Sequence, residues 1–374
     1  MPEYFASAAS HLPLLVESLH RRGYRVLGPT VREGELKLEE LAAATQLPVG
    51  WVDCQAPGSF DLKRTETPAY FACGVGQPSL KNYLFPAVVR LFEARREGAG
   101  WRLIPTFMED GPPPAFLGIR ACDLAGLAVQ DRIFLKGRYV EPLYEKRRRR
   151  ALIIAVHCTQ SRETCFCASL GTGPRATAGF DLVLTEVLEG ERHYFLIEVG
   201  SPEGAQILKE IPHSPAKPEE VAAGEALVGK AAQSQTRMLE THGLKDFLYD
   251  NFENPHWDRV AARCLSCGNC AAVCPTCFCH RLEDTLDLTG EVAERWRLLD
   301  VCFTVDHSYI HGGAIRPSVR ARYRQWLTHK LATWVDQFGC LGCVGCGRCI
   351  TWCPVGIDLT AEVQALKETA AGGK

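Results

Sequence analysis

The second half of this chain is organised by the stretch Cys264-Leu-Ser-Cys267-Gly-Asn-Cys270-Ala-Ala-Val-Cys274-Pro275, whose pattern returns in Cys343-Val-Gly-Cys346-Gly-Arg-Cys349-Ile-Thr-Trp-Cys353-Pro354. In both stretches two residues separate each of the first three cysteines. Three residues precede the fourth cysteine, and a proline follows it. The repetition of one spacing predicts two metal-binding loops of the same design.

The spacing C-x2-C-x2-C-x3-C-P is the one with which bacterial ferredoxins hold [4Fe–4S] clusters. Short spacers let three thiolates surround one cluster, and the fourth cysteine of each run ligates the other cluster. Zinc is the alternative, because cysteine pairs at this spacing also bind Zn²⁺. The doubled pattern with its prolines favours two [4Fe–4S] clusters. We expect one cluster on Cys264, Cys267, Cys270 and Cys353, and the other on Cys343, Cys346, Cys349 and Cys274.

Composition narrows the class of protein. The chain has 374 residues, 46% of them hydrophobic, and a formal net charge of −2, which argues against a general nucleic-acid-binding protein. No run approaches the roughly 18 apolar residues of a membrane helix, and the N-terminus lacks a secretory signal pattern. The 18 cysteines are bunched, unlike a secreted disulfide framework. We therefore expect a cytoplasmic protein that spans no membrane.

Hydrophobic periodicity predicts two domains. Residues 1–210 read as an α/β or α+β domain, residues 211–235 as a linker and the start of a helix, and residues 236–374 as a mostly helical, ferredoxin-like domain with two clusters. The predicted strands are Trp101–Phe107, Ala115–Ile119, Ala151–Val156, Leu182–Val187 and His193–Val199. The predicted helices are Phe5–Leu19, Thr236–Asn251, Glu291–Leu299, Pro317–Phe338 and Asp358–Thr369.

Four cysteines of the first domain follow two of these strands. Cys122 comes after Ala115–Ile119, and Cys158, Cys165 and Cys167 come after Ala151–Val156. Ligands of open α/β sheets gather at the carboxyl ends of strands. A third [4Fe–4S] cluster on these four thiols is the favoured interpretation; a zinc site and a group of buried free cysteines are the alternatives.

Further segments carry a resemblance to a known family. They are Arg263–Cys279, His311-Gly-Gly, Arg322–Lys330 and Phe338–Asp358 in the second half, and Pro78–Lys81, Phe85-Pro86, Gly118–Asp123 and Thr164–Pro174 in the first. With these segments the chain resembles the iron–sulfur β subunit of cytoplasmic [NiFe] hydrogenases of the sulfhydrogenase type. The equivalent subunit of anaerobic sulfite reductase is similar.

The resemblance implies a subunit without a substrate site of its own. Such a subunit relays electrons between the hydrogenase catalytic subunits and a flavin subunit that handles NAD(P)H, in a hetero-oligomer. The alternative is the equivalent subunit of anaerobic sulfite reductase or of another flavin-coupled reductase. A stand-alone reductive enzyme is a third hypothesis, but it needs a cluster with an open coordination position, whereas both motifs supply four thiolates.

Overall fold

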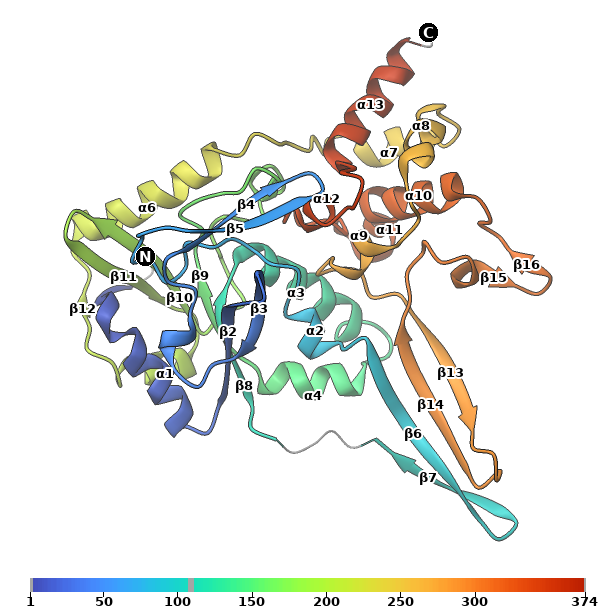
Figure 1. The fold of residues 1–374 in the computed structure, drawn as a ribbon, viewed down its shortest axis with the longest axis horizontal. Coiled ribbons are helices and arrows are strands. Elements are labelled where there is room, and N and C mark those ends of the chain that lie inside the picture. Colours follow the sequence, from blue (N-terminus) through green and yellow to red (C-terminus); the bar gives the residue numbers. More distant parts are fainter. Residues whose placement is uncertain (1–2, 107–110, 373–374) are drawn as a thin grey trace.

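The computed structural model describes residues 3–106 and 111–372, and the largest sheet of this part has eight strands (Figure 1). Its four central strands are parallel, and the outer strands join them antiparallel. In spatial order the strands are β12 (Ser214–Pro215), β1 (Tyr4–Ala8), β11 (Arg192–Val199), β10 (Leu182–Glu189), β9 (Leu152–Val156), β8 (Pro114–Ile119), β2 (Arg25–Arg32) and β3 (Glu35–Glu40).

Both faces of this sheet are covered, which explains why its central strands are continuous hydrophobic runs. All five residues of β9 are buried. Leu117 and Ile154 pack with helix α1 (Leu12–Arg21), whereas Phe116 and Ile153 pack on the opposite face with α3 (Ala121–Phe134). Successive side chains of a strand point to opposite faces, so alternate residues serve two separate cores. The remaining helices here are α4 (Pro142–Arg150), α5 (Pro202–Leu208) and α6 (Pro218–Gln233).

A second sheet projects from the body as a four-stranded arm (Figure 1). Two hairpins from distant parts of the described chain form it, in the order β13 (His280–Leu286), β14 (Val292–Leu299), β6 (Val88–Glu97) and β7 (Gly100–Pro105). The predicted helix Glu291–Leu299 is wrong, because residues Val292–Leu299 form strand β14 of this arm. The segment is rich in helix-forming residues, but pairing with β6 decides its conformation, as tertiary context often overrides local propensity.

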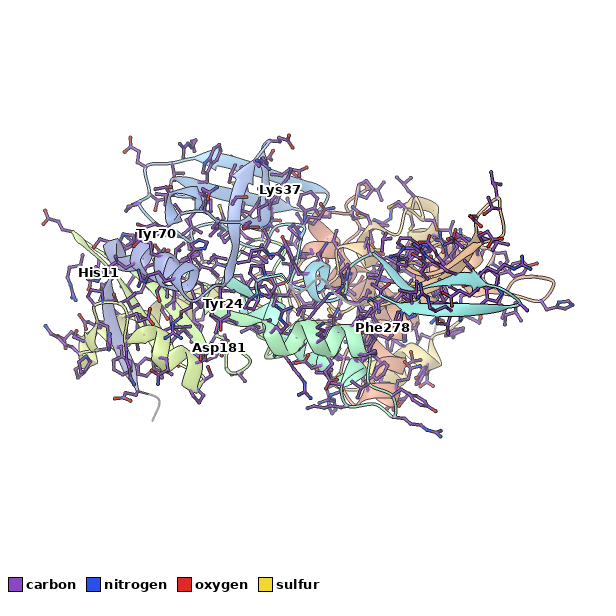
Figure 2. The ribbon with its side chains drawn as sticks, turned by 90° about the horizontal axis from the view of Figure 1, so that it is seen from below. His11, Tyr24, Lys37, Tyr70, Asp181 and Phe278 are labelled. Atoms are coloured by element: carbon purple, nitrogen blue, oxygen red, sulfur yellow. The ribbon has the colours of Figure 1, made fainter. Side chains whose placement is uncertain are left out.

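Short helices enclose the two cysteine tracts around a core that includes Trp257, Tyr323 and Leu366. They are α7 (Leu244–Asp250), α8 (His256–Arg263), α9 (Asn269–Ala272), α10 (Val319–Thr328), a π-helix (His329–Thr333), α11 (Trp334–Phe338), α12 (Arg348–Thr351) and α13 (Leu359–Gly372). Phe278 joins this part to the α/β body (Figure 2), because its ring centroid lies 5.7 Å from that of Phe134 and 5.5 Å from that of Trp334.

Three small elements complete the fold. They are the hairpin β4 (Trp51–Ala56) and β5 (Ser59–Arg64), the helix α2 (Lys81–Leu84), and the pair β15 (Tyr309–Ile310) and β16 (Gly313–Ala314). Within the described ranges, no helix combines the length and the apolar character needed to cross a bilayer.

The strand predictions hold better than the helix predictions. Four predicted strands coincide with β8, β9, β10 and β11; the fifth becomes β7 of the arm, and its predicted end at Phe107 lies outside the described residues. The helices near the C-terminus, Pro317–Phe338 and Asp358–Thr369, are also present.

Two other predicted helices need correction. The segment Phe5–Leu19 begins as β1, and only the second half of Thr236–Asn251 is helical. With strands β13–β16 present, the expectation of a mostly helical second domain is met only in part: the fold is mixed α/β. The division into residues 1–210, 211–235 and 236–374 stays a prediction.

Candidate iron–sulfur centres

The first cysteine tract and the end of the second tract line one hollow. Its volume is about 450 Å³, counting the solvent at its mouth. The cysteines that line it are Cys264, Cys267, Cys270, Cys349 and Cys353. Cys264 and Cys267 lie between α8 and α9, Cys270 lies in α9, and Cys353 follows α12, so two segments far apart in the chain meet here. We call Cys264, Cys267, Cys270 and Cys353 the first group.

Backbone amides already point at the sulfurs of this group. The N–H of Ser266 donates to Cys264 Sγ at 3.3 Å, and the N–H of Ile357 donates to Cys353 Sγ at 3.3 Å. Amide hydrogen bonds to sulfur stabilise thiolates and tune the clusters that they hold. Cys267 is exposed, so the first group reaches the molecular surface.

The remaining motif cysteines form a second, more deeply buried group of Cys274, Cys343, Cys346 and Cys349. Burial raises the pKa of Cys343 to about 12; nearby Lys330 lowers it, and nearby Cys274 and Cys346 raise it. Burial also raises the pKa of Cys349, and the thiols of Cys343, Cys346 and Cys274 add to that effect. Cys274 thus lies with the second tract, although it belongs to the first in sequence.

The four cysteines of the α/β body also converge, as a third group. Cys122 lies at the start of α3, and Cys158, Cys165 and Cys167 lie in the loop after β9. Burial raises the pKa of Cys165 to about 12, and its neighbours Cys167 and Cys158 raise it further. Cys122 is close to Cys167, with which it shares a small apolar cluster. Two strand ends therefore deliver four thiols to one place.

The second and third groups touch each other. Cys346 belongs to the same apolar cluster as Cys122 and Cys167. The N–H of Phe166 donates to the carbonyl of Gly345 at 2.9 Å, and Thr172 Oγ1 donates to the carbonyl of Val344 at 2.8 Å. Gly345 has φ +63°, and a Cβ there would stand 2.6 Å from the backbone N of Cys167. Only glycine fits this contact without strain.

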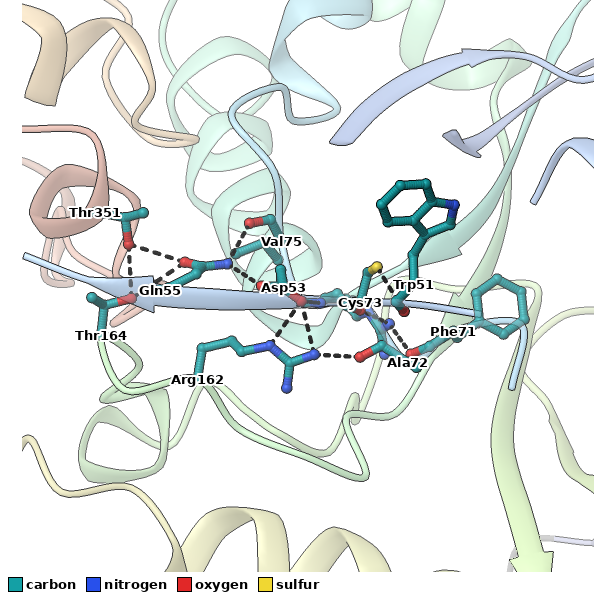
Figure 3. A network of polar contacts seen from close by, with 12 residues as sticks. Trp51, Asp53, Gln55, Phe71, Ala72, Cys73, Val75, Arg162, Thr164 and Thr351 are labelled. Atoms are coloured by element: carbon teal, nitrogen blue, oxygen red, sulfur yellow. Dashed lines mark hydrogen bonds and ion pairs between the residues drawn. The ribbon is translucent and has the colours of Figure 1, made fainter. Parts of the chain in front are cut away.

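A buried polar network holds the third-group loop against the second tract (Figure 3). Asp53 on β4 pairs with Arg162 at 2.8 Å, and both side chains are almost completely buried. The Gln55 side chain donates to Asp53 at 2.6 Å, and its carbonyl oxygen accepts from Thr164 at 3.3 Å and from Thr351 at 3.0 Å. Thr164 lies beside Cys165 and Thr351 lies on α12, so the hairpin fixes two cysteine-bearing segments relative to each other.

No sequence pattern predicted which charged and polar residues contact the three cysteine groups. Lys330 Nζ donates to Cys274 Sγ at 3.3 Å, and Gln235 Nε2 donates to Cys167 Sγ at 3.2 Å. Arg348, 1% exposed, pairs with Asp123 at 2.9 Å, between Cys122 and Cys346. A motif specifies ligands, whereas these partners come from elements that only the fold brings near.

The other thiols flank the groups. Cys277 is buried and hydrogen-bonds with Cys274, while Cys279 lies near Cys302 and His307. All 18 cysteines of the chain are free. Within residues 3–106 and 111–372, no three His, Cys, Asp or Glu side chains stand close enough to hold a single metal ion.

The first two groups fit [4Fe–4S] clusters by the chemistry of their donors. Each has four cysteines as possible thiolate ligands, which is the set that such a cluster requires. The first has a hollow at its centre and amide donors at its sulfurs, and the second has a buried ammonium. Both features offset the negative charge of thiolates.

Comparisons with known proteins point to [4Fe–4S] clusters in the second half of the chain. A family model described as a 4Fe-4S dicluster domain matches residues 263–357. The β subunit of sulfhydrogenase 2 from Pyrococcus furiosus is 34% identical over 258 residues, which are 68% of this chain and 73% of that relative. No solved structure gives a significant match. With its dicluster domain and this identity over most of its length, the chain belongs to the family of sulfhydrogenase β subunits.

Proposed function

We propose that this chain relays electrons between a [NiFe] hydrogenase module and a flavin module that handles NAD(P)H. Membership of the sulfhydrogenase β family and the 4Fe-4S dicluster domain support an electron-transfer role. When bound, [4Fe–4S] clusters accept and release single electrons. The chain's own residues hold these clusters, shield them from water and set their spacing.

The observation that carries the proposal is the exchange of the fourth cysteines. Cys353 lines the hollow of the first tract, and Cys274 is buried beside Cys343, Cys346 and Cys349 of the second tract. This arrangement supports one cluster on Cys264, Cys267, Cys270 and Cys353, and another on Cys343, Cys346, Cys349 and Cys274. The exchange ties the two tracts together, so neither cluster site is complete without both.

We also propose a third cluster, on Cys122, Cys158, Cys165 and Cys167, at one end of a linear relay. The second group stands between the other two: Cys349 is close to Cys270, and Cys346 is close to Cys122 and Cys165. The first group reaches the surface through exposed Cys267. Electrons then pass along the order first, second, third, or the reverse.

Iron content tests the ligand assignment. Anaerobic reconstitution of the full chain with iron and sulfide is expected to give about 12 iron atoms, at four per cluster. The double variant Cys165→Ser/Cys167→Ser is expected to hold about 8. Cys54→Ser, an exposed thiol outside the three groups, is the matched control and keeps the full count. An unchanged count in the double variant would refute the third cluster.

Co-purification tests the partners. The tagged chain, isolated anaerobically from its native host, is expected to carry a flavoprotein and a [NiFe] catalytic subunit. Recovery of a sulfite-reducing subunit in place of the hydrogenase would refute the assignment to hydrogenase and favour the sulfite reductase alternative.

A further inference from the structure

Lys330 is a buried cation placed directly against the second group. Its exposed fraction is 2%. Its Nζ donates to Cys274 Sγ at 3.3 Å, to Cys277 Sγ at 3.4 Å, to Thr276 Oγ1 at 3.2 Å and to the carbonyl oxygen of Gly342 at 2.9 Å. A single ammonium thus contacts two sulfurs and two oxygens.

The local backbone explains how a lysine reaches this position. Lys330 lies in the π-helix His329–Thr333, between α10 and α11. A π-turn inserts an extra residue into the helical ladder and shifts the side chains that follow, and such turns are frequent at functional sites. The rings of Trp326 and Trp334 flank the ammonium at 5.9 and 5.6 Å. The Lys330 ammonium therefore lies in the core beside two aromatic rings.

A buried ammonium needs a negative partner. Burying an ammonium is costly, and Lys330 Nζ offsets this cost with hydrogen bonds to two sulfurs and two oxygens. No carboxylate of the described residues forms an ion pair with Lys330. The negative charge that compensates Lys330 is therefore that of thiolates and of the group they hold.

The surroundings of the three groups are unequal in charge. Lys81 is also buried, donates to the carbonyl of Ala272 at 2.9 Å, and lies near Cys274 and Cys277. In contrast, the third group has the neutral amide of Gln235 on Cys167, and the charge of Arg348 near Cys122 is balanced by its ion pair with Asp123. Near the first group, Arg322 donates hydrogen bonds to Ser266 Oγ and to the carbonyl oxygen of Pro317, and not to a sulfur. Among the twelve candidate ligands, all of them described, Cys274 has the one sulfur with a hydrogen bond from a charged side chain.

We infer that Lys330, assisted by Lys81, gives the cluster of the second group the highest reduction potential of the three. The inference rests on the proposed ligand assignment. Gaining one electron adds one negative charge to a cluster, so a nearby positive charge stabilises the reduced form more than the oxidised form. The electron comes from, and later returns to, a neighbouring cluster.

Burial acts in two directions here. It removes water that would stabilise the extra charge, and this lowers the potential of the second cluster. It also removes the water that would screen an ammonium at hydrogen-bonding distance. Because Lys330 touches the ligand itself, the direct charge outweighs the lost hydration. The cluster of the second group, which lies between the other two, would then be the first of the three to be reduced.

Potentiometric titration followed by electron paramagnetic resonance tests this inference on the reconstituted full chain. The wave of highest potential is assigned by its persistence in Cys267→Ser and in Cys165→Ser/Cys167→Ser, which remove the first and third sites. In Lys330→Met this wave is expected to move to lower potential by at least about 59 mV. For a one-electron couple this shift corresponds to a tenfold change in the ratio of oxidised to reduced cluster at a given potential. Lys330→Arg keeps the charge and is expected to restore most of the potential.

Controls separate charge from structure. Lys330→Gln keeps a donor without the charge and is expected to move the wave in the same direction as Lys330→Met. Lys81→Met is expected to give a smaller shift, because Lys81 bonds to a carbonyl and not to sulfur. Exposed Lys245, which pairs with Asp336, is the matched control, and Lys245→Met leaves the wave in place.

Two results would overturn the inference. One is an unchanged wave in Lys330→Met and Lys330→Gln at full iron content. The other is a loss of about four irons in both variants, which would make Lys330 a structural support of the site. Failure of the ligand assignment is a different outcome, because the unsubstituted chain would then lack the iron and the signals of the second cluster.

Discussion

Removing the charge of Asp53 is expected to loosen the third-group loop. Asp53 is 2% exposed, and its carboxylate accepts from Arg162 at 2.8 Å, from Gln55 at 2.6 Å and from the N–H of Gly74 at 2.6 Å. In Asp53→Asn the shape is kept, but Arg162, 8% exposed, loses its counter-charge. The amide group of the new asparagine also places its own N–H donors toward one of the groups that now donate to Asp53, so two donors face each other.

The free-energy cost of Asp53→Asn follows from the burial of the Asp53–Arg162 ion pair. Breaking a buried ion pair by removing one partner costs about 3–5 kcal/mol, because the other charge stays buried and unpaired. An exposed pair costs about 0.2–1 kcal/mol. Since about 1.4 kcal/mol corresponds to a factor of ten, local opening of the loop is expected to become more frequent by roughly two to four powers of ten.

Hydrogen exchange measures this opening. The amide of Phe166, which bonds to Gly345, reports on the contact between the loop and the second tract. Its exchange is expected to accelerate in Asp53→Asn, together with a loss of up to about four irons from the third site. Asp336→Asn breaks the exposed pair with Lys245 and is the control. Equal exchange of Phe166 in the two variants would refute the reasoning that this network clamps the loop.

Three further predictions concern the cysteine groups and the isolated chain. Cys274→Ser, made together with Cys277→Ser so that the neighbouring thiol cannot substitute, is expected to alter the spectrum of the second cluster and to leave that of the first; a change confined to the first cluster would contradict the exchanged ligation. Gly345→Ala is expected to reduce the iron of the third site and to cost well over the roughly 1–2 kcal/mol of a left-handed residue, because its Cβ would meet the Cys167 backbone at 2.6 Å. Gly290→Ala, at φ +71° with nothing within 4 Å, costs the left-handed strain alone, and equal thermal stability of the two variants would contradict the packing argument. The isolated chain is expected neither to oxidise H₂ nor to reduce NAD(P)⁺, and sustained turnover would show a catalytic site of its own.

The sequence by itself determined the chemistry of the centres. Cysteine spacing is a local property, because two or three intervening residues fix how far apart thiols of one loop can lie. The same locality made the buried strands readable: β9 is a run of apolar residues, and its burial on both faces follows from that run. The family could also be recognised from such stretches, and the relative that shows it is 34% identical over 258 residues.

Only the tertiary structure decided what depends on distant partners. The segment Val292–Leu299 has helix-forming residues, yet it is a strand because β6, about 200 residues earlier in sequence, supplies its hydrogen bonds. The contact of Lys330 with Cys274 depends on a π-turn, and the contact of Gln55 with Thr164 and Thr351 joins three separate segments. Local sequence can specify which atoms bind a cluster, but the charges and clamps around it come from long-range packing, which no short window of residues encodes.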